Sequence, residues 1–392
     1  MINETTQNRD STLKLGFIGG AMDSAVGETH KISSQMDERW QLEAGCFSTR
    51  TDENLTTGHA WGVESGRIYT SYTEMLAEEQ GKLDAVAILT PTPSHAEIVI
   101  SALKYGYPVI CEKALATSSE EIKNILHAVD EYSGYLTVTY NYTGYPMVRE
   151  LQKIVKSGRL GRLQQIHIEM PQEGFLRLDG NGNKAEPQVW RLHDGIVPTV
   201  SLDLGVHIHQ MIKFLSGECP VELIAMNNKF GLFDDIVDNT MCIAKYSGDV
   251  DCQIWFGKTA LGNSNGLRVR VYGDKGSAEW YQLQPETLVV YDNRGRKNIL
   301  ERSSVDLIIA NDRRYNRFKA GHPAGFIEAF ANLYYDIAYD IQQFKANEKS
   351  NSPWVFGADV ALEGLEMLET MAQSAKDKEW KTVPPLDSAF SK

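Results

Sequence analysis

The stretch LKLGFIGGAMDSAVG, residues 13–27, decides the fold of this chain. Its first six residues form a short apolar run with strand character, which leads directly into Gly19 and Gly20. A segment compatible with a helix then follows up to Trp40. A strand, a glycine loop and a helix in this order predict a dinucleotide-binding turn, because backbone N–H groups at a helix N-terminus must approach a pyrophosphate closely.

The glycine loop departs from the Gly-x-Gly-x-x-Gly pattern of such turns. If the pattern began at Gly19, it would also need glycine where Ala21 and Ser24 stand. A lengthened loop closed by Gly27 is one interpretation, and a plain tight turn is the other.

The segments that follow alternate between strand and helix patterns. Residues 41–47 and 84–89 have the pattern of buried strands, and residues 72–79 between them have that of a helix. Such alternation predicts a parallel sheet, whose ligands bind beyond the carboxyl ends of the strands. The polar residues expected at those ends are Thr90, Pro91, His95, Glu112 and Lys113.

Length and composition exclude several classes of protein. A chain of 392 residues with 42% hydrophobic residues predicts two domains. The formal net charge of -13 argues against a nucleic-acid partner, which needs clustered basic residues. No apolar run approaches the roughly 18 to 20 residues of a membrane span, and residues 1–14 do not resemble a secretory signal. The five cysteines are odd in number and widely spaced, so we expect a soluble protein of the reducing cytoplasm.

The second half contains a candidate catalytic pair, Asp203 and His207, at the predicted start of a helix. Residues four apart share one helix face, so a carboxylate and an imidazole could act on one substrate. An imidazole can accept a hydroxyl proton near neutral pH, and Lys113 could steady the developing alkoxide. An ordinary helix-face pair is the alternative. A metal site with His209 is not expected, because positions two apart on a helix point to different faces.

The motifs Thr90-Pro91 with His95, Cys111-Glu112-Lys113, and Asp203-Leu204-Gly205-Val206-His207 resemble those of the glucose–fructose oxidoreductase, inositol dehydrogenase and MocA (Gfo/Idh/MocA) family. The resemblance implies that Lys113 is a catalytic lysine beside the nicotinamide, with Ala114 where the family has proline. It also makes Asn141 the counterpart of a family asparagine.

The resemblance further implies an architecture. An NAD(P)-binding Rossmann domain with a parallel sheet would span residues 1–141. An α/β domain with a large, mostly antiparallel sheet would span residues 142–392, and its C-terminal helices would pack back on the Rossmann domain. The hairpin signal around Gly273-Asp274-Lys275-Gly276 agrees with such a sheet. A homodimer or homotetramer is implied as well.

The cofactor is expected to be NAD or NADP. Residues 46–50 lack the acidic residue that holds the adenosine ribose, whereas Ser48, Thr49 and Arg50 could hold a 2′-phosphate. A lengthened loop could alternatively bring Asp52 to the ribose.

We therefore expect hydride transfer between a nicotinamide and a secondary hydroxyl of a sugar, sugar derivative or cyclitol. The alternatives are glycoside cleavage through transient oxidation and elimination, and a non-catalytic nucleotide-sensing protein. No metal is expected. The expected catalytic residues are Lys113, Asp203 and His207. The expected cofactor-binding residues are Gly19, Gly20, Ala21, Ser48, Arg50, Thr90, Pro91, His95, Glu112, Lys113 and Asn141. The expected substrate-binding residues are Lys113, Tyr142, Trp190, Arg191, Asp203, His207 and His322.

Overall fold

The computed structural model describes residues 12–348 and 352–386, and the chain folds into two compact units. The first unit comprises the chain up to Glu112, Asn124–Thr139 and Phe330–Gly357. The second unit comprises Lys113–Lys123, Tyr140–Ala329 and the chain from Ala358 onward.

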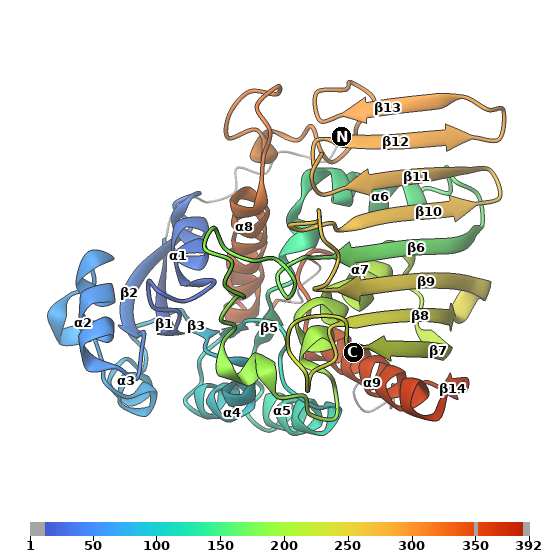
Figure 1. Ribbon diagram of the computed structural model, residues 1–392. Helices are drawn as coiled ribbons and strands as arrows, with labels where there is room; N and C mark the ends of the chain where they lie inside the picture. Colours follow the sequence, from blue (N-terminus) through green and yellow to red (C-terminus); the bar gives the residue numbers. More distant parts are fainter. Residues whose placement is uncertain (1–11, 349–351, 387–392) are drawn as a thin grey trace. The chain divides into compact units, whose positions relative to one another are not determined.

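A parallel five-stranded sheet forms the centre of the first unit, with the strand order β2-β1-β3-β4-β5 (Figure 1). Its strands are β1 (Leu13–Gly19), β2 (Trp40–Cys46), β3 (Ala85–Leu89), β4 (Val109–Cys111) and β5 (Leu136–Val138). The helices between them are α1 (Gly27–Gln35), α2 (Thr51–Ala60), α3 (Tyr72–Glu78), α4 (His95–Lys104) and α5 (Ser119–Glu131). The predicted parallel α/β architecture is thus confirmed.

Helix α8 (Phe326–Lys345) completes the core of this unit although it lies far away in sequence. From Phe330 onward its apolar residues join one buried cluster with β1 and β2, in which Phe17 and Tyr334 are almost fully buried. The indole N–H of Trp40 donates a hydrogen bond to the backbone carbonyl of Tyr334 at 2.9 Å.

The glycine loop after β1 is lengthened, and α1 begins at Gly27. Gly19 and Gly20 have φ angles of 80° and 75°, a backbone region that L side chains rarely adopt. A Cβ atom on Gly27 would lie 1.9 Å from the carbonyl oxygen of Gly20, so only glycine allows the helix to start this close to the loop. The interpretation of a longer loop closed by Gly27 agrees with this geometry.

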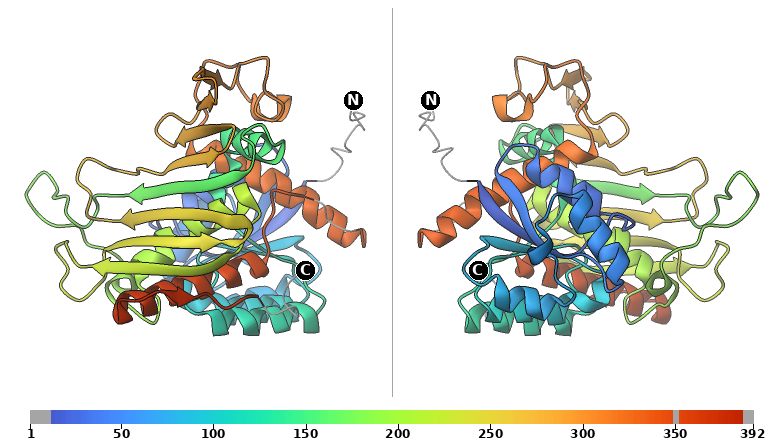
Figure 2. Two further views of the ribbon diagram at one scale, coloured as in Figure 1. Left: turned by 90° about the vertical axis from the view of Figure 1, so that its right-hand side faces the viewer. Right: turned by 90° about the vertical axis from the view of Figure 1, so that its left-hand side faces the viewer.

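A nine-stranded sheet dominates the second unit, in the order β13-β12-β11-β10-β6-β9-β8-β7-β14. All neighbouring strands are antiparallel except β6 and β9, which are parallel, so the prediction of a mostly antiparallel sheet is confirmed. The left view of Figure 2 shows these strands side by side. The strands are β6 (Leu163–Pro171), β7 (Pro220–Asn228), β8 (Asn239–Tyr246), β9 (Val250–Gly257), β10 (Arg268–Gly273), β11 (Gly276–Tyr281), β12 (Thr287–Asp292), β13 (Lys297–Glu301) and β14 (Lys381–Thr382).

One face of this sheet is covered by α6 (Pro146–Lys156), α7 (Val206–Ser216) and α9 (Ala358–Asp377) (Figure 1). On β8, Ala244 and Tyr246 are buried toward these helices, and the Tyr246 hydroxyl lies 3.2 Å from the sulfur of Met367 in α9. Met241 and Ile243 alternate with them and are exposed on the other face. Among the described residues, no helix is both long and apolar enough to cross a membrane.

Candidate active site

The carboxylate of Asp203 is the centre of a charge cluster in the second unit. Lys113 Nζ lies 2.8 Å from Asp203 Oδ1, and it also donates to the Asp203 backbone carbonyl at 2.9 Å. Arg191 Nη1 and Lys258 Nζ both lie 2.6 Å from the other oxygen, Oδ2. The four side chains are between 12% and 22% exposed, so these charges interact largely out of water.

Each cation of this cluster reaches Asp203 from a different chain segment. Lys113 lies two residues after the end of β4, and Lys258 directly follows β9. The backbone N–H of Lys258 donates to the carbonyl of Asp238 at 2.8 Å, which fixes the point where the lysine leaves the strand. Arg191 belongs to the short helix Val189–Leu192, and its guanidinium lies 4.7 Å from the ring centroid of Trp190.

The cluster determines how Asp203 and Lys258 ionise. Burial opposes the charge of Asp203, but Lys113, Lys258 and Arg191 together hold its pKa well below the usual value. Burial also lowers the pKa of Lys258, and the positive charges of Arg191 and Lys113 lower it further, against the attraction of Asp203. Asp203 is therefore a permanent carboxylate, whereas Lys258 gives up its proton more easily than an ordinary lysine.

His207 lies in the first turn of α7, is 5% exposed and is surrounded by aromatic rings. The Tyr142 ring meets the imidazole edge to face at a centroid distance of 4.7 Å, and the Tyr140 ring lies at 6.4 Å. The hydroxyl of Tyr142 accepts a hydrogen bond from Asn265 Nδ2 at 3.0 Å, which orients this ring. A buried imidazole held by packing can exchange a proton with a bound hydroxyl.

The backbone between Asp203 and His207 differs from the predicted helix start. Residues Ser201–Gly205 form a π-helical turn, and α7 follows directly from it. The expectation of a shared face assumed α-helical spacing for both residues, which the wider π turn does not have. Single π-helical turns inside helices are frequent at functional sites.

Glu112, the residue before Lys113, belongs to a buried polar cluster of the first unit. Its Oε1 lies 3.0 Å from His30 Nε2 and accepts a hydrogen bond from the Thr139 hydroxyl. His30 Nδ1 in turn lies 2.7 Å from the Tyr334 hydroxyl. Glu112 was predicted as a cofactor-binding residue. The hydrogen bonds also give it a role in holding the end of β4 in place.

The segment after β2 shows which carboxylate interacts with Ser48 and Arg50. Asp52 is exposed, whereas the next residue, Glu53, is half-buried, and its carboxylate contacts Ser48 and Arg50. Glu53 Oε2 accepts hydrogen bonds from the Ser48 hydroxyl and, at 3.0 Å, from Arg50 Nε. Arg50 is thus already paired with a carboxylate, and its hydrogen bond with Glu53 raises its pKa.

The other predicted residues differ in burial and in hydrogen bonding. His95 is buried, and its Nε2 lies 2.7 Å from the Thr90 carbonyl, so it shapes the loop that contains Pro91. Asn141 is 2% exposed, and its Nδ2 has no hydrogen-bond partner within the described part of the chain. His322 is exposed beside Phe318.

Two further observations concern Ala114 and His209, which the sequence analysis named. The peptide bond between Lys113 and Ala114 is cis. His209 Nε2 lies 3.3 Å from Glu363 Oε1. Within residues 12–348 and 352–386, no group of three or more His, Cys, Asp or Glu side chains is arranged to hold a metal ion.

Sequence reasoning missed Lys258, Glu53 and His30. Lys258 had a usable signal, because it directly follows the alternating pattern of residues 250–257 and so stands at a strand end. Glu53 and His30 lie within helical segments, where a polar side chain usually faces solvent.

Two family models match the chain. The one described as an oxidoreductase family with an NAD-binding Rossmann fold (GFO_IDH_MocA) matches residues 13–140. The one described as a GFO/IDH/MocA C-terminal domain matches residues 148–279. The first match covers the glycine loop and the second covers Asp203 and His207.

Individual relatives extend over more of the chain. An uncharacterized oxidoreductase, YfiI, of Bacillus subtilis is 28% identical over 93% of this chain and 94% of its own. Inositol 2-dehydrogenase of Rhizobium meliloti is 23% identical over 72% of this chain and 80% of its own. The solved structure of an inositol dehydrogenase homolog from Azotobacter vinelandii, complexed with NAD+, has a TM-score of 0.88. It is 24% identical over 95% of this chain and 98% of that chain.

We predict that Asp203→Asn destabilises the protein by roughly 3 kcal/mol or more, because it leaves three largely buried cations without a counter-charge. Urea unfolding at pH 7 measures the difference from the wild type. A carboxylate with a lowered pKa stabilises the fold above its ordinary pKa of 3.8 and loses that effect as the pH falls further. The gap between the two proteins should therefore begin to narrow below about pH 4 and keep narrowing as the pH falls further.

The matched control is Glu222→Gln, which removes a carboxylate that pairs with Lys245 at 2.8 Å on the surface. Exposed pairs contribute little, so we expect a change below about 1 kcal/mol. Equal effects of the two variants at pH 7 would contradict a special role for Asp203.

Proposed function

Because the chain belongs to the Gfo/Idh/MocA family of NAD-binding oxidoreductases, we propose that it transfers a hydride between a nicotinamide and the carbon of a secondary alcohol. The proposed substrate is a sugar, a sugar derivative or a cyclitol. The observation that carries the proposal is the grouping of Lys113 on the Asp203 carboxylate, with His207 four residues further along the chain. The relative named as inositol 2-dehydrogenase supports the substrate class.

The first unit has a backbone that fits a dinucleotide. Gly19 and Gly20 leave the loop after β1 free of side chains, and the missing Cβ of Gly27 lets α1 start against it. The Gly27 N–H already donates to the Ser24 hydroxyl at 2.9 Å, and the next N–H groups of α1 would face a pyrophosphate. When bound, a nicotinamide supplies the hydride acceptor or donor of the reaction.

The residues of the second unit would handle the proton and the charge. In the oxidation direction, the substrate loses a hydride from carbon and a proton from its hydroxyl group, and the C–O bond becomes a carbonyl. His207 would accept that proton. The Lys113 ammonium, held by Asp203 at 2.8 Å, would stabilise the negative charge that develops on the oxygen.

We predict that Lys113→Met and His207→Asn each lower kcat/KM by roughly 10²- to 10⁴-fold, because each removes one proton-transfer or charge-stabilising group. The measurement is NADH absorbance with a panel of inositols and sugars. Lys275→Met is the matched control, since Lys275 lies exposed in the turn between β10 and β11. A wild-type rate in either active-site variant would contradict the assigned roles.

The same assay separates the alternatives. A dehydrogenase forms NADH in proportion to the product. Glycoside cleavage without net NADH formation would favour the transient-oxidation mechanism instead. Binding of NAD without any turnover would favour a nucleotide-sensing protein.

We further propose NAD as the preferred cofactor. The Glu53 carboxylate follows β2, where an acidic residue can accept hydrogen bonds from the ribose hydroxyls of NAD. Its negative charge would repel the 2′-phosphate of NADP, and its pairing with Arg50 removes the cation that could attract that phosphate. The description of the matching family model as NAD-binding supports the same choice.

We predict that Glu53→Gln shifts the ratio of kcat/KM for NADP+ to that for NAD+ by roughly tenfold toward NADP+, since it removes a repulsive charge. Asp52→Asn is the control, because Asp52 is its exposed neighbour with the same charge. An equal shift in both variants would indicate a general charge effect and would refute the role of Glu53.

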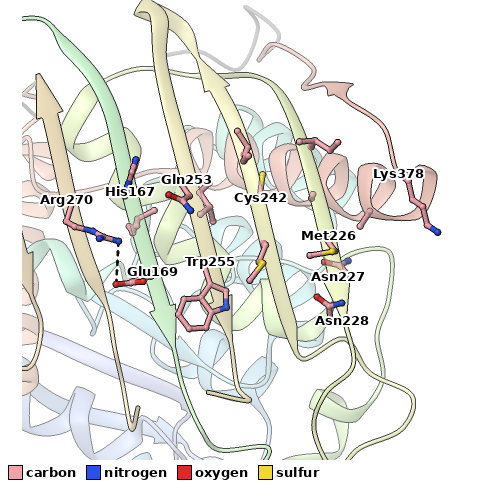
Figure 3. Close-up of a pocket in the computed structure, with 17 residues that line it drawn as sticks. His167, Glu169, Met226, Asn227, Asn228, Cys242, Gln253, Trp255, Arg270 and Lys378 are labelled. Atoms are coloured by element: carbon pink, nitrogen blue, oxygen red, sulfur yellow. Dashed lines mark ion pairs between the residues drawn. The ribbon is translucent and has the colours of Figure 1, made fainter. Parts of the chain in front are cut away.

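A homodimer or homotetramer formed through the open face of the nine-stranded sheet is a further part of the proposal. This face holds a hollow of about 810 Å³ lined by residues of β6 to β10, together with Ala375 and Lys378 at the end of α9 (Figure 3). Met226, Met241 and Ile243 are 45% to 54% exposed there, and large exposed apolar patches mark interaction sites. Glu169 and Arg270 lie on the same face, with a side-chain nitrogen and oxygen 3.7 Å apart. In a two-fold interface, the acidic and basic groups of one copy could therefore pair with the opposite charges of the second copy.

We predict that Met241→Lys combined with Ile243→Lys converts the oligomer to a monomer, because buried unpaired charges disrupt an apolar interface. Light scattering coupled to size exclusion measures the mass. Val305→Lys is the control, since Val305 is 91% exposed outside this face. A monomeric wild type, or an oligomer that survives the double substitution, would exclude this interface.

A cytoplasmic location is the remaining expectation. All five cysteines lie within the described ranges and are free thiols. Burial raises the pKa of Cys46 to about 11 and holds the pKa of Cys111 well above its usual value, so these thiols are unreactive. Free buried thiols are compatible with a reducing compartment, and cell fractionation would test it.

A further inference from the structure

We infer that the substrate of this site is an anionic polyol, a polyhydroxylated compound with a carboxylate or phosphate group that binds at Arg191 and Lys258. The inference rests on the proposed function, because it names the substrate class of the same site. It differs from the expectation of neutral sugars and cyclitols.

The charge balance around Asp203 is the first observation. Lys113, Arg191 and Lys258 supply three positive charges and Asp203 supplies one negative charge, so two positive charges remain in excess. In the part of the chain that the structure describes, Asp203 is the one acidic group paired with any of these three cations. Surplus charge in a largely buried site is unfavourable unless a bound group compensates it.

The arrangement of the donors is the second observation. Lys113 uses its ammonium group for both Oδ1 and the backbone carbonyl of Asp203. Arg191 and Lys258 instead converge on the single oxygen Oδ2. A guanidinium has five N–H donors and an ammonium has three, so both groups keep donors for a second anion. Lys113 already uses two of its three donors on Asp203 and is proposed to use the third for the reacting oxygen, whereas Arg191 and Lys258 can bind a separate anionic group.

Aromatic rings hold the two ligand-binding cations. Lys258 Nζ lies 5.3 Å from the ring centroid of Phe175, and Arg191 lies 4.7 Å from that of Trp190. These contacts restrict both side chains and exclude water from one side of each charge. Charge-assisted hydrogen bonds to an anion are stronger in such surroundings than in water.

The ionisation of Lys258 agrees with this reading. Burial and the neighbouring cations lower its pKa, so Lys258 in the unliganded site loses its proton at a lower pH than an ordinary lysine does. A bound anion would favour the protonated form again. Binding of the anion should therefore be coupled to proton uptake at alkaline pH.

The test uses two matched pairs of compounds with the NAD+-loaded protein. Gluconate and glucitol differ in one terminal group, a carboxylate against a hydroxymethyl. Glucose 6-phosphate and glucose differ in one phosphate, so the two pairs separate the two kinds of anion. Calorimetry measures the dissociation constants, and we expect the anionic member of at least one pair to bind roughly tenfold or more tightly than its neutral partner.

Two variants test whether the positive charge of Lys258 causes the preference for anionic ligands. Lys258→Met keeps an unbranched side chain of nearly the same length without its charge, and we expect the ratio of anionic to neutral affinity to fall roughly 10- to 100-fold. Lys258→Arg keeps a positive charge and should retain most of the ratio. Proton uptake on binding of the anion, measured in buffers of different ionisation enthalpy, should disappear in Lys258→Met.

Equal affinity within both pairs for the wild-type protein would overturn the inference, and this result does not depend on the folding of any variant. An unchanged ratio in Lys258→Met would overturn it as well. NADH formation is measured separately. Turnover of neutral polyols without preference for the anions would reject this inference and leave the proposed function intact. Selective anion binding without NADH formation would keep this inference and reject the dehydrogenase activity.

Discussion

The second unit depends on one largely buried carboxylate, that of Asp203, which binds cations from three distant chain segments. A carboxylate taken out of water must be paired, and so must each of the cations that pair with it. Lys113 follows the Rossmann strand β4, Arg191 lies in a short helix and Lys258 directly follows the sheet strand β9. The attraction of all three cations to Asp203 joins these segments at one point, which is where the chemistry is proposed to occur.

The site has more positive charge than is needed to pair the carboxylate of Asp203. One carboxylate with one lysine would already be a satisfied pair. Arg191 and Lys258 both add to Oδ2, although burial and the neighbouring cations oppose the charge of Lys258. Groups held in an unfavourable environment are typical of functional sites, because a ligand can relieve the penalty. The surplus charge thus connects the stability of the site to the kind of substrate it is proposed to accept.

The main constraint on the first unit is different, because its backbone must come close to the proposed dinucleotide. Gly19, Gly20 and Gly27 keep Cβ atoms out of the turn after β1. The cluster of His30, Glu112 and Thr139 gives the polar end of β4 hydrogen-bond partners inside an apolar core, as buried polar groups need. Helix α8 closes that core from the far end of the chain, so the unit requires residues separated by about three hundred positions.

Sequence alone determined the alternation of strands and helices and allowed a lengthened loop closed by Gly27 as one of two interpretations. The mostly antiparallel second sheet was implied by the resemblance to the family, with which the hairpin signal at Gly273-Asp274-Lys275-Gly276 agreed. The sequence also singled out Lys113, Asp203, His207 and Arg191. These features have local signals, since periodicity, glycine and short motifs act within a few residues of one another. Only the tertiary structure decided that Lys258 joins Arg191 on one carboxylate oxygen, that Glu53 rather than Asp52 meets Ser48 and Arg50, and that Asp203 lies in a π-helical turn. The physical reason is that charge pairing depends on which distant segments meet and how a helix winds locally, and neither is encoded in the spacing of residues.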